Sequence, residues 1–383
     1  MKPNHWNYFE TYNERCLLKL DQARSTGRFI VGVYCIFAPV ELIRAAGGIS
    51  VGLCGKKQDP IARAEEELPA NLCPLIKSSY GYAASDTCPY FAASDVIVGE
   101  TTCDGKKKMF ELLGRIKPLH MMYLPSNMEA SHALDFWRKE LERFRMFLEE
   151  RFGVSVTGEA LFRQIRLTNR IQKEFRRLIE HHRSGRLPVS GGELLVVLET
   201  RGFIVDPEAY LHHLETLNAE VEALPVVEAR AGMPRILLTG TPVGKGSDKV
   251  IRILENAGTI VIAQENCTGM KSLFYPIDEE VAAADPMQAL AMRYLQLPCS
   301  CMSPNPNRFR LLEHFIRNFG IQGVVDMTWQ CCHTYNIEAF SVKRHIEERF
   351  HIPVLHLETD YSTSDIGQLE TRIEAFVERI RSG

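Results

Sequence analysis

Eleven cysteines are the residues best suited to chemistry in this chain of 383 amino acids, and they stand at positions 16, 35, 54, 73, 88, 103, 267, 299, 301, 331 and 332. An odd number of thiols is not a closed disulfide framework, and thiols at this density point to metal or redox chemistry. Buried thiols also serve as small apolar core residues. That second interpretation fits Cys16, Cys35 and Cys54, which lie in or beside apolar runs.

Three cysteines in the first third of the chain lie in local sequences that suit ligand loops. Cys73 and Cys88 each precede a proline, and Cys103 lies in Thr-Thr-Cys-Asp-Gly-Lys. A proline after cysteine occurs in iron–sulfur proteins, where it stiffens the loop that carries the thiolate. The spacings are much longer than those of a ferredoxin or a zinc ribbon. Spacing alone therefore leaves two interpretations open, a cluster site or ordinary buried thiols.

The last third offers Cys267 in Glu-Asn-Cys-Thr-Gly, Cys299 and Cys301 in Cys-Ser-Cys, and the pair 331–332. Thiolates are soft ligands that suit iron–sulfur clusters or zinc. A zinc ion would use four of them, so the larger number present favours iron–sulfur. We expect His333 to be a hydrogen-bonding neighbour or proton donor, not a ligand.

The segments that must position these residues alternate between short β-branched runs and stretches with helical period. This alternation predicts parallel strands connected by helices. In the first third we predict strands at 29–34, 48–53, 95–99 and 119–124, with helices at 40–46 and 106–116. In the last third we predict strands at 235–239, 259–263, 323–327 and 353–357, with helices at 247–256, 308–319, 339–350 and 366–380.

The middle of the chain changes to long helical patterns at 132–152, 158–183 and 207–224, and a boundary is predicted at 229–234. We therefore predict an α/β protein with two Rossmann-like or flavodoxin-like domains that have small parallel sheets. The N-terminal domain covers 1–128, a helical linker segment covers 129–230, and the C-terminal domain covers 231–383.

Ligands of such sheets bind beyond the carboxyl ends of the strands. Cys103, Cys267 and the pair 331–332 each follow a predicted strand. We therefore expect strand-end loops of two facing domains to bring these thiols into one cleft.

Composition restricts the functional classes. Lys and Arg number 45 against 48 Asp and Glu, a net charge of −3 that argues against a surface tracking nucleic acid. The most apolar window, 29–54, is interrupted by Pro39, Glu41 and Arg44, so no membrane span is predicted. The first residues lack an apolar signal core, so we expect a cytoplasmic protein.

A glycine-rich segment follows the strand predicted at 235–239. Its sequence, Gly-Thr-Pro-Val-Gly-Lys-Gly-Ser over 240–247, resembles a phosphate-binding loop. However, its glycines are one residue too close, and Gly246 occupies the place of the Ser or Thr that would bind magnesium. We interpret the segment as a tight turn lining the cleft, without ATP.

Several runs resemble the cluster-binding subunits of 2-hydroxyacyl-CoA dehydratases. They are Gly-Val-Tyr-Cys-Ile-Phe-Ala-Pro-Val-Glu-Leu-Ile-Arg-Ala-Ala-Gly (32–47), Leu-Cys-Pro-Leu-Ile-Lys-Ser-Ser-Tyr-Gly (72–81), Thr-Cys-Asp-Gly-Lys-Lys-Lys (102–108), Cys-His (332–333) and the tail 358–376. The resemblance covers nearly the whole chain. In that family three cysteines hold one 4Fe–4S cluster, and they match Cys73, Cys103 and Cys332 here.

The additional cysteines resemble the homodimeric branch of double-cubane cluster proteins. In that branch two 4Fe–4S cubanes share a sulfide, which gives an 8Fe–9S cluster with six cysteine ligands. The ligands that the resemblance implies are Cys73, Cys88, Cys103, Cys267, Cys301 and Cys332. Cys299 competes with Cys301, Cys331 is left out because neighbouring side chains usually point apart, and Cys35 borders the cluster as an outer thiol.

What the resemblance implies is an oxygen-sensitive, ATP-dependent, low-potential reductase of small molecules, without nucleic acid or membrane partners. A separate ATP-hydrolysing 4Fe–4S activator would supply its electrons. Proton donors should line the cleft, and His333 and Glu41 are the catalytic candidates. Lys77 and Lys106 could offset cluster charge.

Three other functions remain open, of which a structural zinc protein is the most distant. The first is a true (R)-2-hydroxyacyl-CoA dehydratase subunit, a lyase with a single 4Fe–4S cluster and room for a CoA thioester. The second is an electron-transfer module or scaffold with no substrate of its own.

Overall fold

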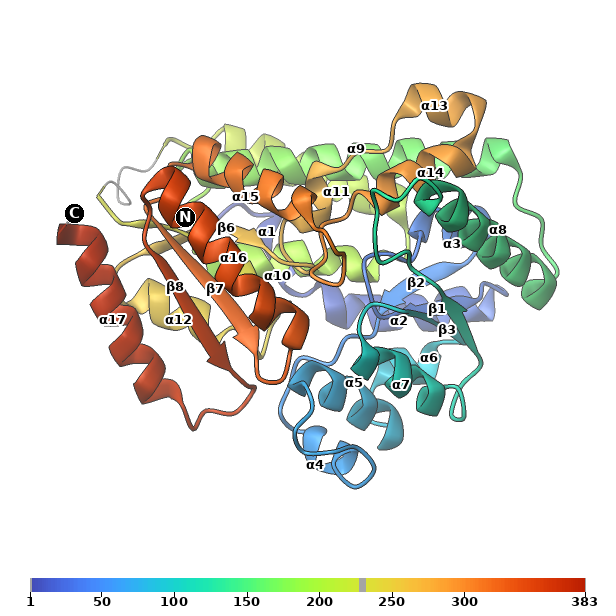
Figure 1. Ribbon diagram of the computed structural model, residues 1–383. Coiled ribbons are helices and arrows are strands. Elements are labelled where there is room, and N and C mark those ends of the chain that lie inside the picture. Colours follow the sequence, from blue (N-terminus) through green and yellow to red (C-terminus); the bar gives the residue numbers. More distant parts are fainter. Residues whose placement is uncertain (1, 227–231, 383) are drawn as a thin grey trace.

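Two parallel four-stranded sheets organise the chain in the computed structural model, which describes residues 2–226 and 232–382. The first sheet has the order β2-β1-β3-β4 and the second the order β6-β5-β7-β8, each in its own lobe (Figure 1). The strands are β1 (Ile30–Val33), β2 (Ile49–Gly52), β3 (Val96–Glu100), β4 (Leu119–Met122), β5 (Arg235–Gly240), β6 (Ile260–Glu265), β7 (Gly323–Trp329) and β8 (Val354–Thr359). The predicted fold class is therefore confirmed.

Several strands are short apolar runs because both faces of each sheet are covered. Every residue of the central strands β3 and β7 and of the edge strand β6 is buried, as expected for parallel sheets flanked by helices. Each of the eight predicted strands lies within two residues of an observed one at either end. Of the predicted boundary at 229–234, residues 229–231 lie outside the described part of the chain.

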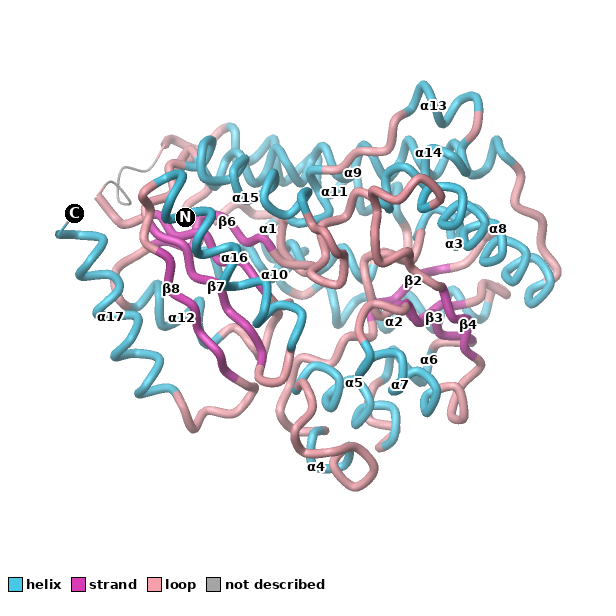
Figure 2. The backbone as a smooth tube through the Cα atoms, viewed as in Figure 1, coloured by secondary structure: helices cyan, strands magenta, loops and turns pink. Residues whose placement is uncertain are grey.

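The helices wrap the sheets and connect the lobes (Figure 2). They are α1 (Trp6–Glu10), α2 (Tyr12–Ser25), α3 (Val40–Ala45), α4 (Ile61–Ala64), α5 (Pro74–Ala84), α6 (Pro89–Ala93), α7 (Asp104–Leu113), α8 (Ala133–Phe152), α9 (Gly158–Arg183), α10 (Gly191–Glu199), α11 (Pro207–Glu222), α12 (Lys249–Asn256), α13 (Glu279–Ala284), α14 (Pro286–Leu295), α15 (Pro306–Phe319), α16 (His333–Phe350) and α17 (Ile366–Ser382), with 3-10 turns η1 (Thr200–Phe203) and η3 (Lys271–Phe274).

Two helices tie the lobes together. The 26-residue α9 runs from one lobe to the other (Figure 1) and packs against α3, α11 and η3. After β6 the chain returns to the first lobe, where α14 packs against α8. Leu290 of α14 and Trp137 of α8 share a buried apolar cluster with Val98 of β3. The last third of the chain thus completes the core beside the first sheet.

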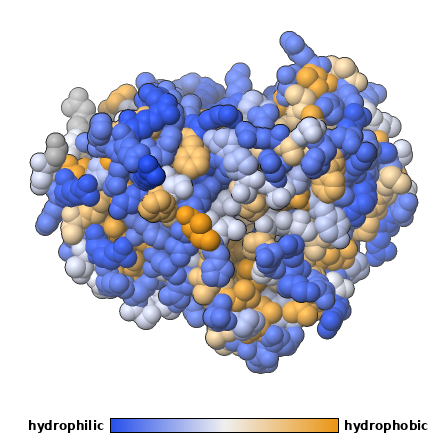
Figure 3. Space-filling view, viewed as in Figure 1, coloured by the Kyte–Doolittle hydropathy of each residue, from blue (hydrophilic) through white to orange (hydrophobic). Residues whose placement is uncertain are grey.

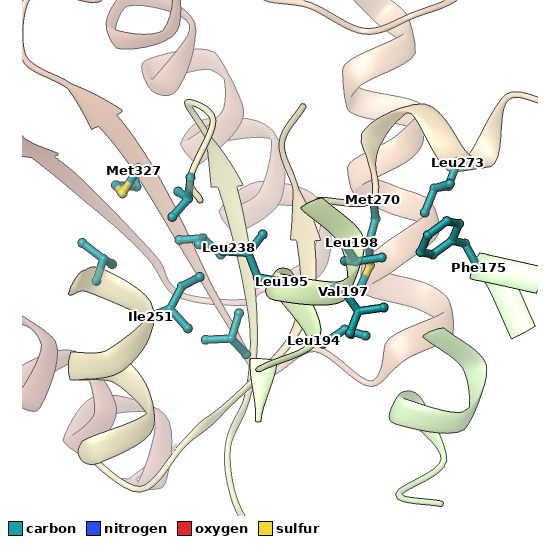
Figure 4. Packing of buried hydrophobic residues seen from close by; sticks show 14 of the residues in the cluster. Phe175, Leu194, Leu195, Val197, Leu198, Leu238, Ile251, Met270, Leu273 and Met327 are labelled. Carbon is teal, nitrogen blue, oxygen red and sulfur yellow. The ribbon is translucent and has the colours of Figure 1, made fainter. Parts of the chain in front are cut away.

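The second lobe packs its sheet against the middle helices. Figure 4 shows Leu194, Leu195 and Leu198 of α10 directed toward the buried strands, with Phe175 of α9 beside Leu273. All five side chains are essentially inaccessible to solvent. Packing against the sheet, more than intrinsic propensity, therefore stabilises the nine-residue α10.

The surface view in Figure 3 is mostly hydrophilic, with apolar side chains in scattered groups. Within the described residues, no helix combines the length and apolar character needed to cross a bilayer.

Candidate functional site

A cavity of about 560 Å³ lies where the carboxyl ends of the two sheets meet, and most of the cysteines line it. In both sheets the chain order reverses around the first strand, so the ends of β1 and β3, and of β5 and β7, are switch points where α/β proteins bind ligands. The cavity-lining cysteines are Cys35, Cys54, Cys73, Cys103, Cys267, Cys299, Cys301, Cys331 and Cys332. The predicted convergence of strand-end thiols is therefore observed.

Three of these thiols share a local architecture. Cys73, Cys103 and Cys332 are the N-cap residues of α5, α7 and α16, respectively. The unpaired N–H groups and the positive end of the helix dipole favour a negative charge at this position. The helix ends therefore favour the thiolate at all three cysteines, although burial raises the pKa of Cys103 and the hydrogen bond with Cys73 raises the pKa of Cys332.

Two of the helix-capping thiols also pair with one another. A hydrogen bond with the Cys332 thiol lowers the pKa of Cys73, and the N–H groups of Leu75 and Ile76 lower it further. Burial opposes these effects. Cys73 comes from the first lobe and Cys332 from the second, so the pair bridges the two domains.

A second group of cavity-lining thiols comes from the last third of the chain. Cys267 follows β6, while Cys299 and Cys301 lie between α14 and α15. A hydrogen bond with Cys301 lowers the pKa of Cys299 to about 6, with Lys271 and Lys106 adding to the effect. Cys299 is therefore the better thiolate of this pair, and both members line the cavity.

The remaining cysteines occupy different surroundings. Cys88 caps α6, its sulfur accepts a hydrogen bond from Phe91 N at 3.4 Å, and it is absent from the cavity wall. Cys16 is fully buried in the core, as the apolar interpretation expected. Cys331 has a positive φ of 60° and lines both this cavity and a neighbouring one of about 200 Å³.

Two buried lysines face the thiols. Lys106 donates to Tyr34 O at 3.2 Å, while Lys271 donates to Tyr335 Oη at 2.7 Å and pairs with Glu265 at 3.0 Å. Burial alone would lower the pKa of each ammonium group, but the surrounding thiols and carboxylates raise it. Both lysines therefore stay charged. Lys106 lines the thiol cavity, whereas Lys271 does not line it and acts electrostatically on Cys267.

Lys77, the other lysine considered for this role, points elsewhere. Its Nζ pairs with Glu65 at 2.7 Å and donates to Ala70 O at 2.8 Å. It lines only the smaller neighbouring cavity.

The acid–base candidates both reach the cavity. Glu41 is 1% exposed near the start of α3 and accepts a hydrogen bond from Tyr294 Oη at 2.7 Å. His333 is the first residue of α16 and also lines the wall. A second acidic residue, Glu100, ends β3 and does not line the cavity, and burial raises the pKa of its carboxyl to about 7.

The glycine-rich segment behaves as a turn at the cavity. Gly240 has a φ of 112°, and a Cβ there would lie 2.1 Å from Met327 O, so only glycine fits. Thr241 and Pro242, which follow it, line the cavity.

The donor set suits a cluster more than a single ion. Within 2–226 and 232–382, no three His, Cys, Asp or Glu side chains are grouped closely enough to hold one metal ion. The thiols instead surround a chamber, the arrangement an iron–sulfur cluster uses because each cysteine binds a different iron.

Sequence reasoning missed several charged groups of this site. Lys271, Arg201 and Arg293 all lie on segments with no recognisable motif. Their burial beside the cavity follows from packing between distant helices, although Lys271 shares a strand-end loop with Cys267.

Comparison with known proteins agrees with this geometry. Residues 35–380 match the family model of the 2-hydroxyglutaryl-CoA dehydratase D-component. The protein named as dehydratase subunit YjiM of Escherichia coli (strain K12) is 41% identical to this chain. The match covers 99% of this chain and 98% of the relative. Subunit beta of (R)-2-hydroxyglutaryl-CoA dehydratase from Acidaminococcus fermentans is 22% identical, covering 94% and 95%. The lactoyl-CoA dehydratase subunit beta of Anaerotignum propionicum is 22% identical, covering 94% of each chain.

Proposed function

The chain belongs to the 2-hydroxyglutaryl-CoA dehydratase D-component family, and from this membership and the thiol-lined cavity we propose that it is an iron–sulfur reductase of small molecules. The cluster proposed is the 8Fe–9S double cubane. The observation that carries the proposal is the number of cysteines on one cavity wall, which exceeds the three that a single family cubane uses.

The proposed ligands divide into two groups of three. Cys73, Cys103 and Cys332 would hold one cubane at the ends of their helices. Cys267, Cys299 and Cys301 would hold the other, so Cys299 and Cys301, which the sequence treats as alternatives, would both be ligands because both line the cavity. Cys299 takes the place that the sequence reasoning gave to Cys88, because Cys299 lines the cavity with a lowered pKa whereas Cys88 does not line it.

The cluster, when bound, would supply low-potential electrons to a substrate in the cavity. The residues of this chain would supply charge balance and protons. Lys106 on the cavity wall and the buried Lys271 near Cys267 would offset the negative charge of thiolates and sulfides. Glu41 and Tyr294 form a buried carboxylate–phenol pair at the wall, a route along which a proton can be held and passed on.

We further propose a homodimer that receives electrons from a separate ATP-hydrolysing 4Fe–4S activator. The absence of a phosphate-binding pattern at 240–247 is consistent with an ATPase on another polypeptide.

The named relatives favour a second candidate, a dehydratase subunit that eliminates water from a 2-hydroxyacyl-CoA at a single 4Fe–4S cluster. A cavity of about 560 Å³ would have to hold the acyl end of that thioester beside the cluster.

Anaerobic iron and sulfide analysis tests the proposal. We expect about eight irons per chain for the double cubane and about four for the single cluster. Four irons with turnover of a 2-hydroxyacyl-CoA in the presence of an activator would replace the first proposal with the second.

A further inference from the structure

Besides the thiols, the cavity is lined by three arginines, of which Arg293 is buried and Arg44 and Arg201 are partly buried. Their hydrogen bonds go to neutral oxygens. Arg201 donates from Nη2 to the carbonyls of Thr268 at 3.0 Å and Gly269 at 2.6 Å, and Arg293 donates to backbone carbonyls at 3.1 Å. In the described part of the chain, no carboxylate lies within ion-pair distance of any of the three.

Two of these guanidinium groups also keep unused donors. Arg44 Nε and Arg201 Nη1 are buried atoms with no hydrogen-bond partner among the described residues. Burial lowers the pKa of Arg201 to about 10, so the group stays positively charged at neutral pH. A buried charge with an unused N–H costs free energy unless a ligand pairs with it.

Arg44 of α3 and Arg201 of η1 each contact α9, at residues about two helical turns apart. Arg44 Nη1 reaches Thr168 Oγ1 at 3.5 Å, and the guanidinium of Arg201 lies over the Phe175 ring at 5.4 Å. Gln172 lies between them on the same helix, is 7% exposed, lines the cavity and has an unpartnered Oε1. The unused polar atoms of α3, α9 and η1 therefore belong to residues that line the same cavity.

The acidic residues on the cavity wall already have hydrogen-bond or ion-pair partners. Glu41 accepts from Tyr294, Glu199 pairs with Lys56, and Asp104 pairs with Lys107 at 2.6 Å. Glu41 acts electrostatically on Arg44 and the Cys267 thiol on Arg201, but neither guanidinium forms an ion pair with a carboxylate of the described residues.

We propose that Arg44, Gln172 and Arg201 form a subsite for a small carboxylate. The planar guanidinium fork matches a carboxylate, and the Gln172 amide can turn to donate to it. Arg293 adds positive charge near Arg201. This inference rests on the proposed function in taking the cavity as the substrate chamber, and it names the chemical class of the substrate.

Calorimetric titration of the anaerobically purified protein with acetate and with acetamide tests the subsite. The two probes share a shape and differ in charge. We expect acetate to bind at least tenfold more tightly than acetamide, and Arg44→Met to weaken acetate at least tenfold. Gln172→Glu, which is nearly isosteric, should abolish acetate binding and raise the melting temperature because its own carboxylate occupies the site.

Arg176→Met is the matched control, since Arg176 is a half-buried arginine of α9 that donates to Leu273 O and does not line the cavity. Its affinity for acetate should equal that of the wild type. Equal binding of acetate and acetamide, no acetate binding, or unchanged acetate binding in Gln172→Glu would each overturn the subsite. The iron content of the same samples is measured independently of acetate binding. Acetate binding by a protein that holds no iron would refute only the proposed function and would leave the subsite supported.

Discussion

The exchange of Cys88 for Cys299 in the ligand set can be tested by a pair of alanine variants. In the double cubane each cubane takes three thiolates, so removal of one leaves an iron open to water and oxygen. Cys299 is 8% exposed on the cavity wall and has a pKa lowered to about 6. We expect Cys299→Ala to reduce the iron content from about eight to about four per chain or fewer, with loss of reductase activity.

Cys88→Ala should behave as a packing change. The structure gives its sulfur one long hydrogen bond, from Phe91 N at 3.4 Å, as the cap of the five-residue α6. Loss of that cap should lower the free energy of unfolding by about 1 kcal/mol and leave the iron content unchanged. Cys16→Ala is the matched control, since it removes a buried thiol that donates to Phe203 O at 3.2 Å, again about 1 kcal/mol.

The assay is iron, sulfide and visible absorption of the three variants purified side by side without oxygen. Full iron in Cys299→Ala together with loss of iron in Cys88→Ala would refute the reasoning, because the cavity wall would then not identify the ligands. Loss of iron in the Cys16→Ala control would show that the measurement reports folding, not ligation.

Three further predictions concern charge and protons at the site. Lys271→Met removes a buried ammonium group beside Cys267, so the reduction potential of the cluster should fall by tens of millivolts in an anaerobic redox titration, and an unchanged potential would contradict the charge-balancing role. Burial raises the pKa of Glu100 from 4.5 to about 7, so the folded state holds a proton that the unfolded state releases, and stability should fall as pH rises through this window. Glu100→Gln should therefore stabilise the protein by about 2–3 kcal/mol more at pH 8 than at pH 5, and equal unfolding free energies at both pH values would exclude this effect. His333→Ala should leave the cluster spectrum intact and slow reduction at least tenfold, and an unchanged rate would remove its proton-donor role.

The sheets could be predicted from the sequence because each strand is a short β-branched run between helical patterns. Helix boundaries were harder. Helix α16 begins at His333, whereas the amphipathic pattern predicted its start at 339. Residues 333–338 include a buried Tyr335 whose hydroxyl accepts from Lys271, so tertiary contacts, not periodicity, extend the helix. Helix α5 was missed because nearly all its residues are buried, which leaves no amphipathic period to detect.

The position of the thiols could be predicted because it depends on topology. A residue that follows a parallel strand lies at the carboxyl edge of its sheet, whatever its neighbours are, and Cys103, Cys267 and Cys332 obey this rule. Some thiols do not follow a strand. Where such a thiol caps a helix, it reaches the cavity only if that helix packs with its first turn toward the cavity. Cys73 and Cys88 both precede proline and both cap a helix, yet only Cys73 lines the cavity.

The same distinction explains why the arginines were missed. Arg44, Gln172 and Arg201 lie on three elements that are distant in sequence, and none follows a strand end. They line one cavity because α3 packs against α9, and because the Arg201 side chain of η1 reaches over the Phe175 ring of α9. A buried charge is informative only once its partners are known, since an ion-paired arginine would be structural, whereas Arg44 and Arg201 retain unused donors toward the cavity. Sequence therefore indicates where electrons could be held, and packing indicates what kind of molecule could receive them.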